Sequence, residues 1–249
     1  MFDVSIPSLA AITATFFAAG LVKGVTGMGL PTVAMGVLGA LMSPLTAAGL
    51  LVVPSFVTNV WQLLAGPNIG SLLRRLWPMM LAIVAGTVLG SAWIASGDTG
   101  LTSTMLGIAL VIYSGYTLFA RQFSIAQHVE PWLSPVIGAI TGVVTGGTGV
   151  FVVPAVPYLQ ALELSRDDLV QALGLSFTVS TIALAIGLGL QGSFQSEGLV
   201  LSALAIVPAL GGMWTGQLIR NRISPSAFRR GFLIGLLLLG CEMAIRPIL

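Results

Sequence analysis

Charged side chains are scarce in this sequence. Only 7% of its 249 residues are Asp, Glu, Lys or Arg, whereas soluble domains carry about 25%. A single Cys excludes an internal disulfide, and a single His leaves a His-rich metal site without its ligands. The Arg residues are scattered through short loops, so there is no basic patch for nucleic acid. The chain is instead 56% hydrophobic with a mean hydropathy of +1.01, which indicates a polytopic membrane protein.

Six apolar runs are long enough to cross a bilayer, which takes about 20 residues. They cover 45–65, 76–96, 101–120, 168–190, 197–219 and 229–247. Shorter runs flank two Gly-rich stretches, one in each half of the chain. We therefore predict a helical hairpin at 8–43 and another at 133–162, each made of two short helices that meet at a Gly-rich break.

The distribution of Arg predicts the orientation of these segments. The loops at 66–77, 121–132 and 220–230 carry Arg, whereas those at 97–100 and 191–196 carry neither Lys nor Arg. By the positive-inside rule, the Arg-bearing loops are cytoplasmic. With Arg166 also cytoplasmic, the second hairpin starts and ends inside, and by the same logic the first starts and ends outside. The two halves then have opposite orientations.

The predicted fold class is an all-α polytopic membrane protein with two inverted-topology repeats. Each repeat is a broken helical hairpin followed by three transmembrane helices. The first repeat takes up 1–125 and the second 126–249. Short internal similarities support this division, since Gly86-x-x-x-Gly90 in the first half matches Gly212-x-x-x-Gly216 in the second.

A Gly/Thr-rich motif occurs once in each hairpin. The first copy runs from Gly20 to Gly29 and the second from Gly138 to Gly149. Helices in lipid rarely contain such breaks, because freed backbone groups need partners that lipid does not offer. A helix that begins after a break presents unpaired N–H groups and a partial positive charge, which bind anions. The alternative is that the glycines only allow close helix packing.

The only lysine, Lys23, lies inside the first copy of the motif. A charge within the membrane is costly and marks a functional site by default. A cation beside a helix N-terminus suits an anionic ligand. The alternative is that Lys23 extends to the membrane interface. The second copy has Thr141 at the matching place, so the charge occurs in one half only.

Polar residues line the crossing that follows each hairpin. Ser55, Asn59 and Gln62 share one helical face, and Ser176 and Ser180 repeat part of this pattern. Neutral donors of this kind suit an oxyanion with several oxygens, and hydrogen bonds between helices are the alternative. Tyr113 and Tyr116 lie within the run at 101–120 and either line a pathway or pack, and the sequence favours packing.

These considerations give one predicted substrate site. Its residues are Lys23, Thr26, Gly27, Met28, Gly29, Asn59, Gln62, Thr145, Gly146, Gly147, Thr148, Gly149, Ser176 and Ser180. We expect no catalytic residue, no cofactor and no resident metal.

The motifs resemble those of the TauE/SafE family, the sulfite exporter and sulfonate permease group. The resemblance covers nearly the whole chain and depends on Gly20–Pro31, on Ser55–Asn59 and on their counterparts at Gly138–Pro154 and Ser176–Ser180. It implies a bacterial inner-membrane secondary transporter for a sulfur-containing or organic anion, such as sulfite or sulfoacetate. Family members often have a more Gly-rich first motif, and here Met28 replaces one expected Gly.

The sequence therefore predicts a transporter that moves a small anion by alternating access, with that anion and the lipid bilayer as its partners. An anion channel and a membrane assembly factor without transport activity are the alternatives. A membrane-embedded enzyme is not predicted, because the apolar segments contain neither a Ser-His pair nor a metal site. The substrate, the direction of transport, the coupling ion and the formation of a homodimer are left open.

Overall fold

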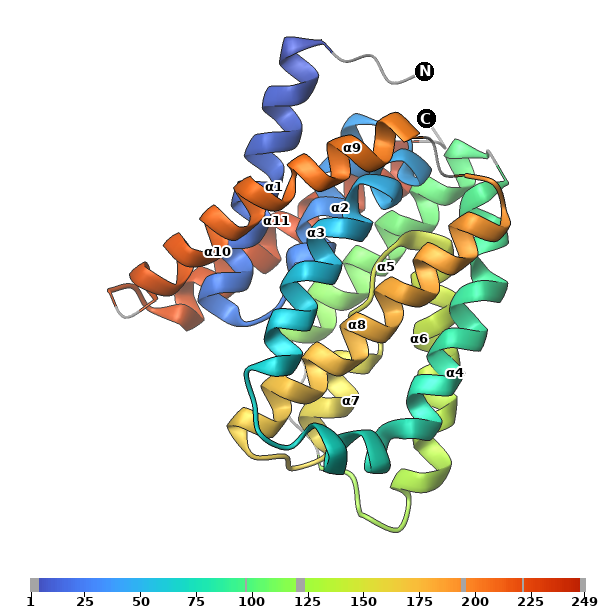
Figure 1. The fold of residues 1–249 in the computed structure, drawn as a ribbon, viewed down its shortest axis with the longest axis vertical. Coiled ribbons are helices and arrows are strands. Elements are labelled where there is room, and N and C mark those ends of the chain that lie inside the picture. The colour runs from blue at the N-terminus through green and yellow to red at the C-terminus, as the bar shows by residue number, and fades with distance from the viewer. Residues whose placement is uncertain (1–4, 97, 120–123, 194–195, 221, 247–249) are drawn as a thin grey trace.

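The computed structural model describes residues 5–96, 98–119, 124–193, 196–220 and 222–246, and within these ranges the chain is helical without any strand (Figure 1). The helices are α1 (Ile6–Thr26), α2 (Leu30–Leu41), α3 (Pro44–Leu64), α4 (Ile69–Ala95), α5 (Thr99–Phe119), α6 (Glu130–Thr148), α7 (Ala155–Ala161), α8 (Arg166–Leu190), α9 (Ser196–Leu204), α10 (Ile206–Ile219) and α11 (Pro225–Ile245). The last residues of the helices expected at 101–120 and 229–247, and parts of several loops, lie outside the described residues.

Among the residues that the structure describes, six helical segments are long and apolar enough to cross a membrane, which confirms an all-α polytopic membrane protein. They are Ile6–Thr26, Pro44–Leu64, Ile69–Ala95, Thr99–Phe119, Arg166–Leu190 and Gly198–Ile219. The last combines the end of α9 with α10, which meet at Ala205. Pro208 follows closely, and its missing N–H accounts for the interruption. α11 is not among the six, and it carries Arg229, Arg230 and Glu242.

The helices are interrupted at both Gly-rich stretches. α1 ends at Gly27, which has a φ of 80°, and α2 begins after Gly29, which has a φ of 104°. α6 ends at Gly149, which has a φ of 69°. Only glycine adopts such left-handed backbone angles without strain, so the sequence itself sets the position of each break.

The helices beside the breaks differ in length from the expectation of two short helices in each hairpin. α1 has 21 residues and α6 has 19, whereas α2 has 12 and α7 has seven. Residues 150–153 are not helical, and Pro154 contributes because proline disfavours helical geometry in the residue before it.

Close helix packing joins the two halves reciprocally. α1 of the first half packs along α10 of the second, and α6 of the second packs along α4 of the first. Glycines allow both contacts, since a Cβ added to Gly20 would lie 2.1 Å from Ala209 O and one added to Gly142 would lie 2.4 Å from Ile83 O. Both pairs run parallel, and Figure 1 shows α4 and α6 side by side.

Two further large contacts each pair a helix with its counterpart in the other half. α3 packs against α8, and α5 packs against α11. In the first pair Gln62 is bonded to Val170 while Asn59 is bonded to Thr181, so the two helices run antiparallel. In the second pair Gly107 packs against Ala244, and Gly240 packs against Val111. These two helices are therefore antiparallel as well.

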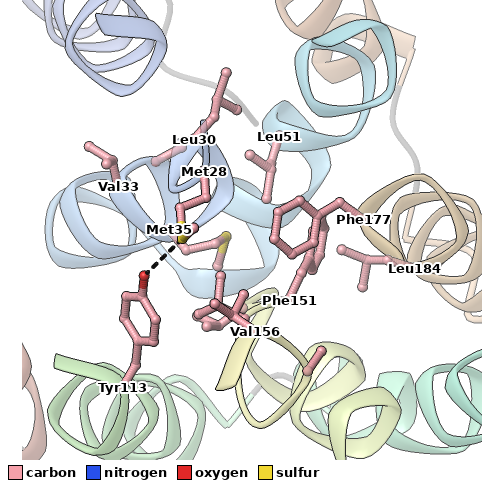
Figure 2. Close-up of a cluster of buried hydrophobic side chains, with 14 of the residues drawn as sticks. Met28, Leu30, Val33, Met35, Leu51, Tyr113, Phe151, Val156, Phe177 and Leu184 are labelled. Carbon is pink, nitrogen blue, oxygen red and sulfur yellow. Dashed lines mark hydrogen bonds between the residues drawn. The ribbon is translucent and has the colours of Figure 1, made fainter. Parts of the chain in front are cut away.

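The apolar core surrounds both breaks. Met28 of the first break and Phe151, which follows Gly149, belong to one cluster of buried side chains that Figure 2 shows in close-up. Met35 of α2 connects them, because a Cβ added to Gly149 would lie 2.8 Å from its Sδ. The two breaks, about 120 residues apart in the sequence, therefore meet in the protein interior.

Candidate functional site

Lys23 is buried in the last turns of α1. Its side chain is 4% exposed, so it does not extend to the protein surface as the interface alternative requires. Nζ lies 3.2 Å from Thr58 Oγ1 and also donates a hydrogen bond to Asn59 Oδ1. Both partners are neutral side chains of α3.

A short hydrogen-bond chain continues from Lys23 across the centre of the protein. Asn59 Nδ2 donates to Thr181 Oγ1 of α8 at 3.2 Å, and Thr181 Oγ1 in turn donates to Phe177 O at 2.7 Å. Thr58 Oγ1 donates to Pro54 O at 2.9 Å. The chain therefore connects α1, α3 and α8, which is the combination of a hairpin and two crossings that the sequence predicted.

Several hydroxyls on the same two crossings are buried and unpaired. Within the described part of the chain, Ser55 Oγ on α3 and both Ser176 Oγ and Ser180 Oγ on α8 have no hydrogen-bond partner, and Gln62 Oε1 is likewise unpaired. A buried polar atom without a partner costs about 1–3 kcal/mol, so each of these atoms would gain from a ligand or water that completes its hydrogen bonds. Gln62 Nε2, by contrast, donates to Val170 O at 2.9 Å.

Three residues of this polar group were missing from the predicted set, namely Ser55, Thr58 and Thr181. Thr58 bonds Lys23 directly, and Thr181 holds the amide of Asn59. A signal for Thr58 was present, since it lies three residues after Ser55 and thus on the same helical face. Thr181 lies next to Ser180, and only the packing of α8 decides which of the two faces Asn59.

Hydrogen bonds within the first break hold its backbone in place. Thr26 Oγ1 lies 2.8 Å from both Val22 O and Met28 O, and the Gly27 N–H donates to Lys23 O at 2.8 Å. In the described residues no side chain caps the start of α2 at Gly29. The first N–H groups of α2 therefore lack a side-chain acceptor, which leaves a partial positive charge beside Lys23 in the chain.

The hydroxyls of the second break form hydrogen bonds with the backbone of the same segment. Thr148 Oγ1 donates to Val144 O at 2.6 Å and accepts from the Val150 N–H at 3.2 Å, and Thr145 Oγ1 donates to Val150 O at 3.3 Å. α7 begins only at Ala155 and is seven residues long, so it offers little helix dipole for an anion.

Two glycines of the second break are packing positions. A Cβ added to Gly146 would lie 2.3 Å from Thr87 O of α4, and one added to Gly147 would lie 3.3 Å from Met105 Cε. The packing alternative therefore describes Gly146, whereas Gly149 supplies the left-handed turn that ends α6.

Apolar side chains fill the space between the breaks. Met28, Met35, Phe151 and Phe177 are all buried there, as Figure 2 shows. The polar group around Lys23 thus lies beside this apolar filling, towards α3 and α8. Met28 and Met35 are unbranched and flexible, so the filling can rearrange at low cost.

Lys23 has no acidic partner in the described residues. The ion pairs found there are Arg75–Glu130, with Nε to Oε1 at 2.7 Å, and Arg246–Glu242 at 3.5 Å. A buried cation that is bonded only to neutral oxygens remains electrostatically uncompensated, and compensation is what makes a buried charge tolerable. The site therefore favours an anionic ligand.

Comparison with families of known proteins agrees with this geometry. The model of the family described as sulfite exporter TauE/SafE matches residues 12–243, which is nearly the whole chain. Comparisons with curated proteins and with solved structures give no match. The matched region contains both breaks, the polar group around Lys23 and the reciprocal helix pairs. The chain therefore belongs to the sulfite exporter TauE/SafE family, a family of membrane transporters for sulfite- and sulfonate-type anions.

Proposed function

We propose that this protein moves a small sulfur-containing anion or organosulfonate across the bacterial inner membrane by alternating access. The observation that carries the proposal is the burial of Lys23, which has no acidic partner among the described residues, together with unpaired hydroxyls on the two crossings to which its hydrogen-bond chain leads. An oxyanion would neutralise the ammonium and accept hydrogen bonds from Ser55, Ser176 and Ser180. The ammonium would thereby gain a counter-charge, and each hydroxyl would gain the hydrogen-bond partner that it lacks.

The helix pairing supports an inverted repeat with 1–125 and 126–249 as its two units. α1 with α10 and α6 with α4 are reciprocal parallel pairs, whereas α3 with α8 and α5 with α11 are antiparallel pairs of counterparts. A two-fold axis perpendicular to α3 and α8 accounts for all four pairs. Inverted repeats of this kind permit rocking of one bundle against the other around a central site.

The apolar filling between the breaks favours a transporter over a channel. A channel needs a continuous path for its ion, with a selectivity filter along it. Met28, Met35 and Phe151 occupy the space between the breaks instead. An anion at Lys23 is therefore enclosed in this conformation, and its release requires these side chains to move.

A ligand screen tests the proposal directly. The purified protein would be heated with sulfite, sulfate, thiosulfate, taurine, sulfoacetate, isethionate and lactate, and its melting temperature would be recorded. We expect stabilisation by at least one sulfur oxyanion in the wild type, because a ligand that binds only the folded state raises its stability. Lys23→Met should remove that stabilisation while the unliganded protein still folds, with Thr141→Val as the matched control. Absence of stabilisation by every anion would overturn the proposal.

Uptake of the stabilising anion into proteoliposomes tests the transport step. The flux should saturate with concentration and should disappear in Lys23→Met. Flux that rises linearly, at rates far above those of transporters, would instead identify a channel.

A further inference from the structure

The buried Lys23 has fewer acceptors than an ammonium group has protons. Its Nζ donates to Thr58 Oγ1 at 3.2 Å and to Asn59 Oδ1, and it has no third acceptor among the described residues. Thr58 Oγ1 gives its own proton to Pro54 O at 2.9 Å, so towards Lys23 it acts only as an acceptor. An ammonium has three N–H donors, whereas a neutral amine has two N–H donors and a lone pair. The two acceptors therefore match a neutral amine and leave the third proton of an ammonium unpaired.

The helices around Lys23 supply no acid that could compensate an ammonium. Helices α2, α3 and α10 contain no charged residue. The charged and titratable residues of α8 and α11 are Arg166, Asp167, Asp168, Arg229, Arg230, Cys241 and Glu242. Both aspartates lie in the first turn of α8, several turns before Thr181, and Glu242 is paired with Arg246. Phe232 of α11 packs beside Gly29 and follows two arginines by about one turn, so the charge on α11 nearest to the first break is positive.

The cavity beside the second break contains no acid or base either. It has a volume of about 230 Å³, and its walls are apolar side chains together with all three tyrosines of the chain, Tyr113, Tyr116 and Tyr158. The Tyr113 hydroxyl points to Met28 Sδ, at 3.8 Å, and not to Lys23 (Figure 2). In the described part of the chain, Lys23 is therefore the one amine at the centre of the protein, with no carboxylate or imidazole beside it.

We infer that Lys23 takes up one proton with each anion that binds and releases that proton with the anion on the other side of the membrane. The inference rests on the proposed function and names the proton as the second partner of the same site. In the empty site Lys23 is a neutral amine. When an anion enters, the lone pair of Nζ forms an N–H bond with a proton from the water on the open side, and the new N–H donates to the anion. On release this bond breaks, the electron pair stays on Nζ, and proton and anion leave together.

This coupling keeps the moving site uncharged in both of its forms. The empty site holds a neutral amine, and the loaded site holds an ammonium beside an anion, whose charges cancel when the anion carries one negative charge. A net charge within the apolar interior is costly, so a permanently charged lysine would hinder the return of the empty protein. Because each anion moves with a proton, a pH difference across the membrane drives the anion towards the more alkaline side.

The alternative is a lysine that stays charged while the anion crosses without a proton. The empty site would then hold an ammonium with an unpaired N–H and without an acid among the described residues. An isolated buried charge of this kind is the least favourable arrangement for an ionisable group, which gives up its charge instead. The hydrogen bonds of Lys23 therefore favour proton coupling.

The first experiment counts the protons that accompany binding. Sulfite, sulfate, thiosulfate and isethionate would be titrated calorimetrically into the purified full-length protein, in phosphate and in Tris buffer, between about pH 6 and pH 9. The difference in heat between the buffers gives the number of protons taken up, after the titration of sulfite itself is subtracted. At the alkaline end we expect about one proton per anion and an affinity that falls about tenfold for each pH unit, because only the protonated lysine binds the anion.

Two variants assign the proton to Lys23. A guanidinium stays charged, so Lys23→Arg should bind the anion without proton uptake and with constant affinity over this pH range. Asn59→Asp places a carboxylate at the present acceptor of Nζ, so it should keep the empty lysine charged, abolish the proton uptake and weaken anion binding about tenfold. If Lys23→Arg does not fold or bind, the pH dependence of the wild type and Asn59→Asp decide. The matched control is His128→Gln, which removes the only histidine, an exposed loop residue, and should leave the uptake unchanged.

Flux measurements test the same coupling across a membrane. Proteoliposomes with a pH-sensitive dye in the lumen would receive the most tightly bound of the four anions outside. Entry of the anion should acidify the lumen by about one proton per anion, and an alkaline lumen should accelerate uptake. Uptake without acidification of the lumen would contradict the inference.

The outcomes separate this inference from the proposed function. If none of the anions binds, both are wrong. Binding with constant affinity over the pH range and without proton uptake in the wild type contradicts proton coupling alone, and the anion site at Lys23 stands. Proton uptake that persists in Lys23→Arg would place the proton on another group, which overturns the inference as well.

Discussion

The two breaks have similar sequences but different structures. The first has a buried lysine, two glycines in left-handed geometry and a 12-residue helix that starts without a side-chain cap. The second has Thr141 in place of Lys23, hydroxyls that bond the local backbone and a seven-residue helix. Glycines bring both hairpins close to helices of the other half, so the difference between the breaks lies in their side chains and helix lengths. We therefore propose that the first break binds the substrate and that the second supports the fold.

The largest expected effect concerns the close helix packing at glycines, which both halves share. Gly20→Leu and Gly142→Leu should each prevent folding, because the new side chain would meet backbone atoms of α10 or α4 that cannot move aside. Overpacking usually costs about 1–3 kcal/mol, and these contacts lie at the severe end. Folding is measured by size-exclusion chromatography and thermal unfolding. Gly115→Leu is the control, because it faces open space. Unequal effects of the two Leu variants would mean that the halves do not pack alike.

The next effect concerns Lys23, which has no charged counterpart in the second half. Lys23→Met should weaken anion binding about 100-fold, because a charge-assisted hydrogen bond contributes about 1.5–3 kcal/mol. Thr141→Met, at the counterpart position, should change the affinity less than threefold. Both affinities are obtained by calorimetric titration with the anion found in the screen. Equal losses in the two variants would make the breaks functionally equivalent.

A third prediction concerns the ion pair that holds the second hairpin to the first half. Arg75 and Glu130 form two hydrogen bonds of 2.7 Å, and Arg75 Nη2 also donates to Leu162 O at 3.3 Å. Arg75→Met should lower the free energy of unfolding by about 1–3 kcal/mol, since the carboxylate of Glu130 stays buried and unpaired while Arg75 was partly exposed.

The matched control for that ion pair lies in α11. Arg246→Met breaks the exposed pair with Glu242, so the loss should be below about 0.5 kcal/mol. Chemical unfolding in detergent measures both values. If the two variants lose equal stability, then Arg75 does not anchor the second hairpin.

The smallest expected effect concerns the threonines that close the breaks. Thr26→Val and Thr148→Val each remove the local hydrogen bonds between a hydroxyl and the backbone, so stability should fall by about 1 kcal/mol in both cases. Anion affinity should stay within a factor of two, although Thr26 belongs to the predicted site. A large affinity loss in Thr26→Val alone would restore Thr26 as a ligand.

Much of the fold was predictable because the signals are local. Helix positions follow from apolar runs, so 45–65 and 168–190 differ by one or two residues from α3 and α8. Breaks follow from glycines such as Gly27 and Gly149, whose left-handed angles other residues avoid. Helix lengths within the hairpins were less accurate, because propensity does not tell how far α1 continues when α10 packs along it.

The substrate site stays a prediction. Lys23, Asn59, Ser176 and Ser180, which we predicted from polar residues within apolar runs, all lie in buried positions. Gly146 was included for its place in the motif, although its contact is with α4. The apolar cavity lined by Tyr113, Tyr116 and Tyr158 was not predicted, since its walls come from segments about 40 residues apart in the sequence.

The sequence by itself determined that this chain is a helical membrane protein, where its helices are interrupted and that its only lysine lies within the first Gly/Thr-rich motif. These properties depend on hydropathy and on backbone angles, which each residue carries with it. Only the tertiary structure decided that Lys23 is bonded to Asn59 and has no acidic partner among the described residues. The tertiary structure also decided that the breaks meet across Met28, Met35 and Phe151, and that all three tyrosines line one apolar cavity. Such relations arise when distant segments exclude lipid together, and no local pattern encodes them.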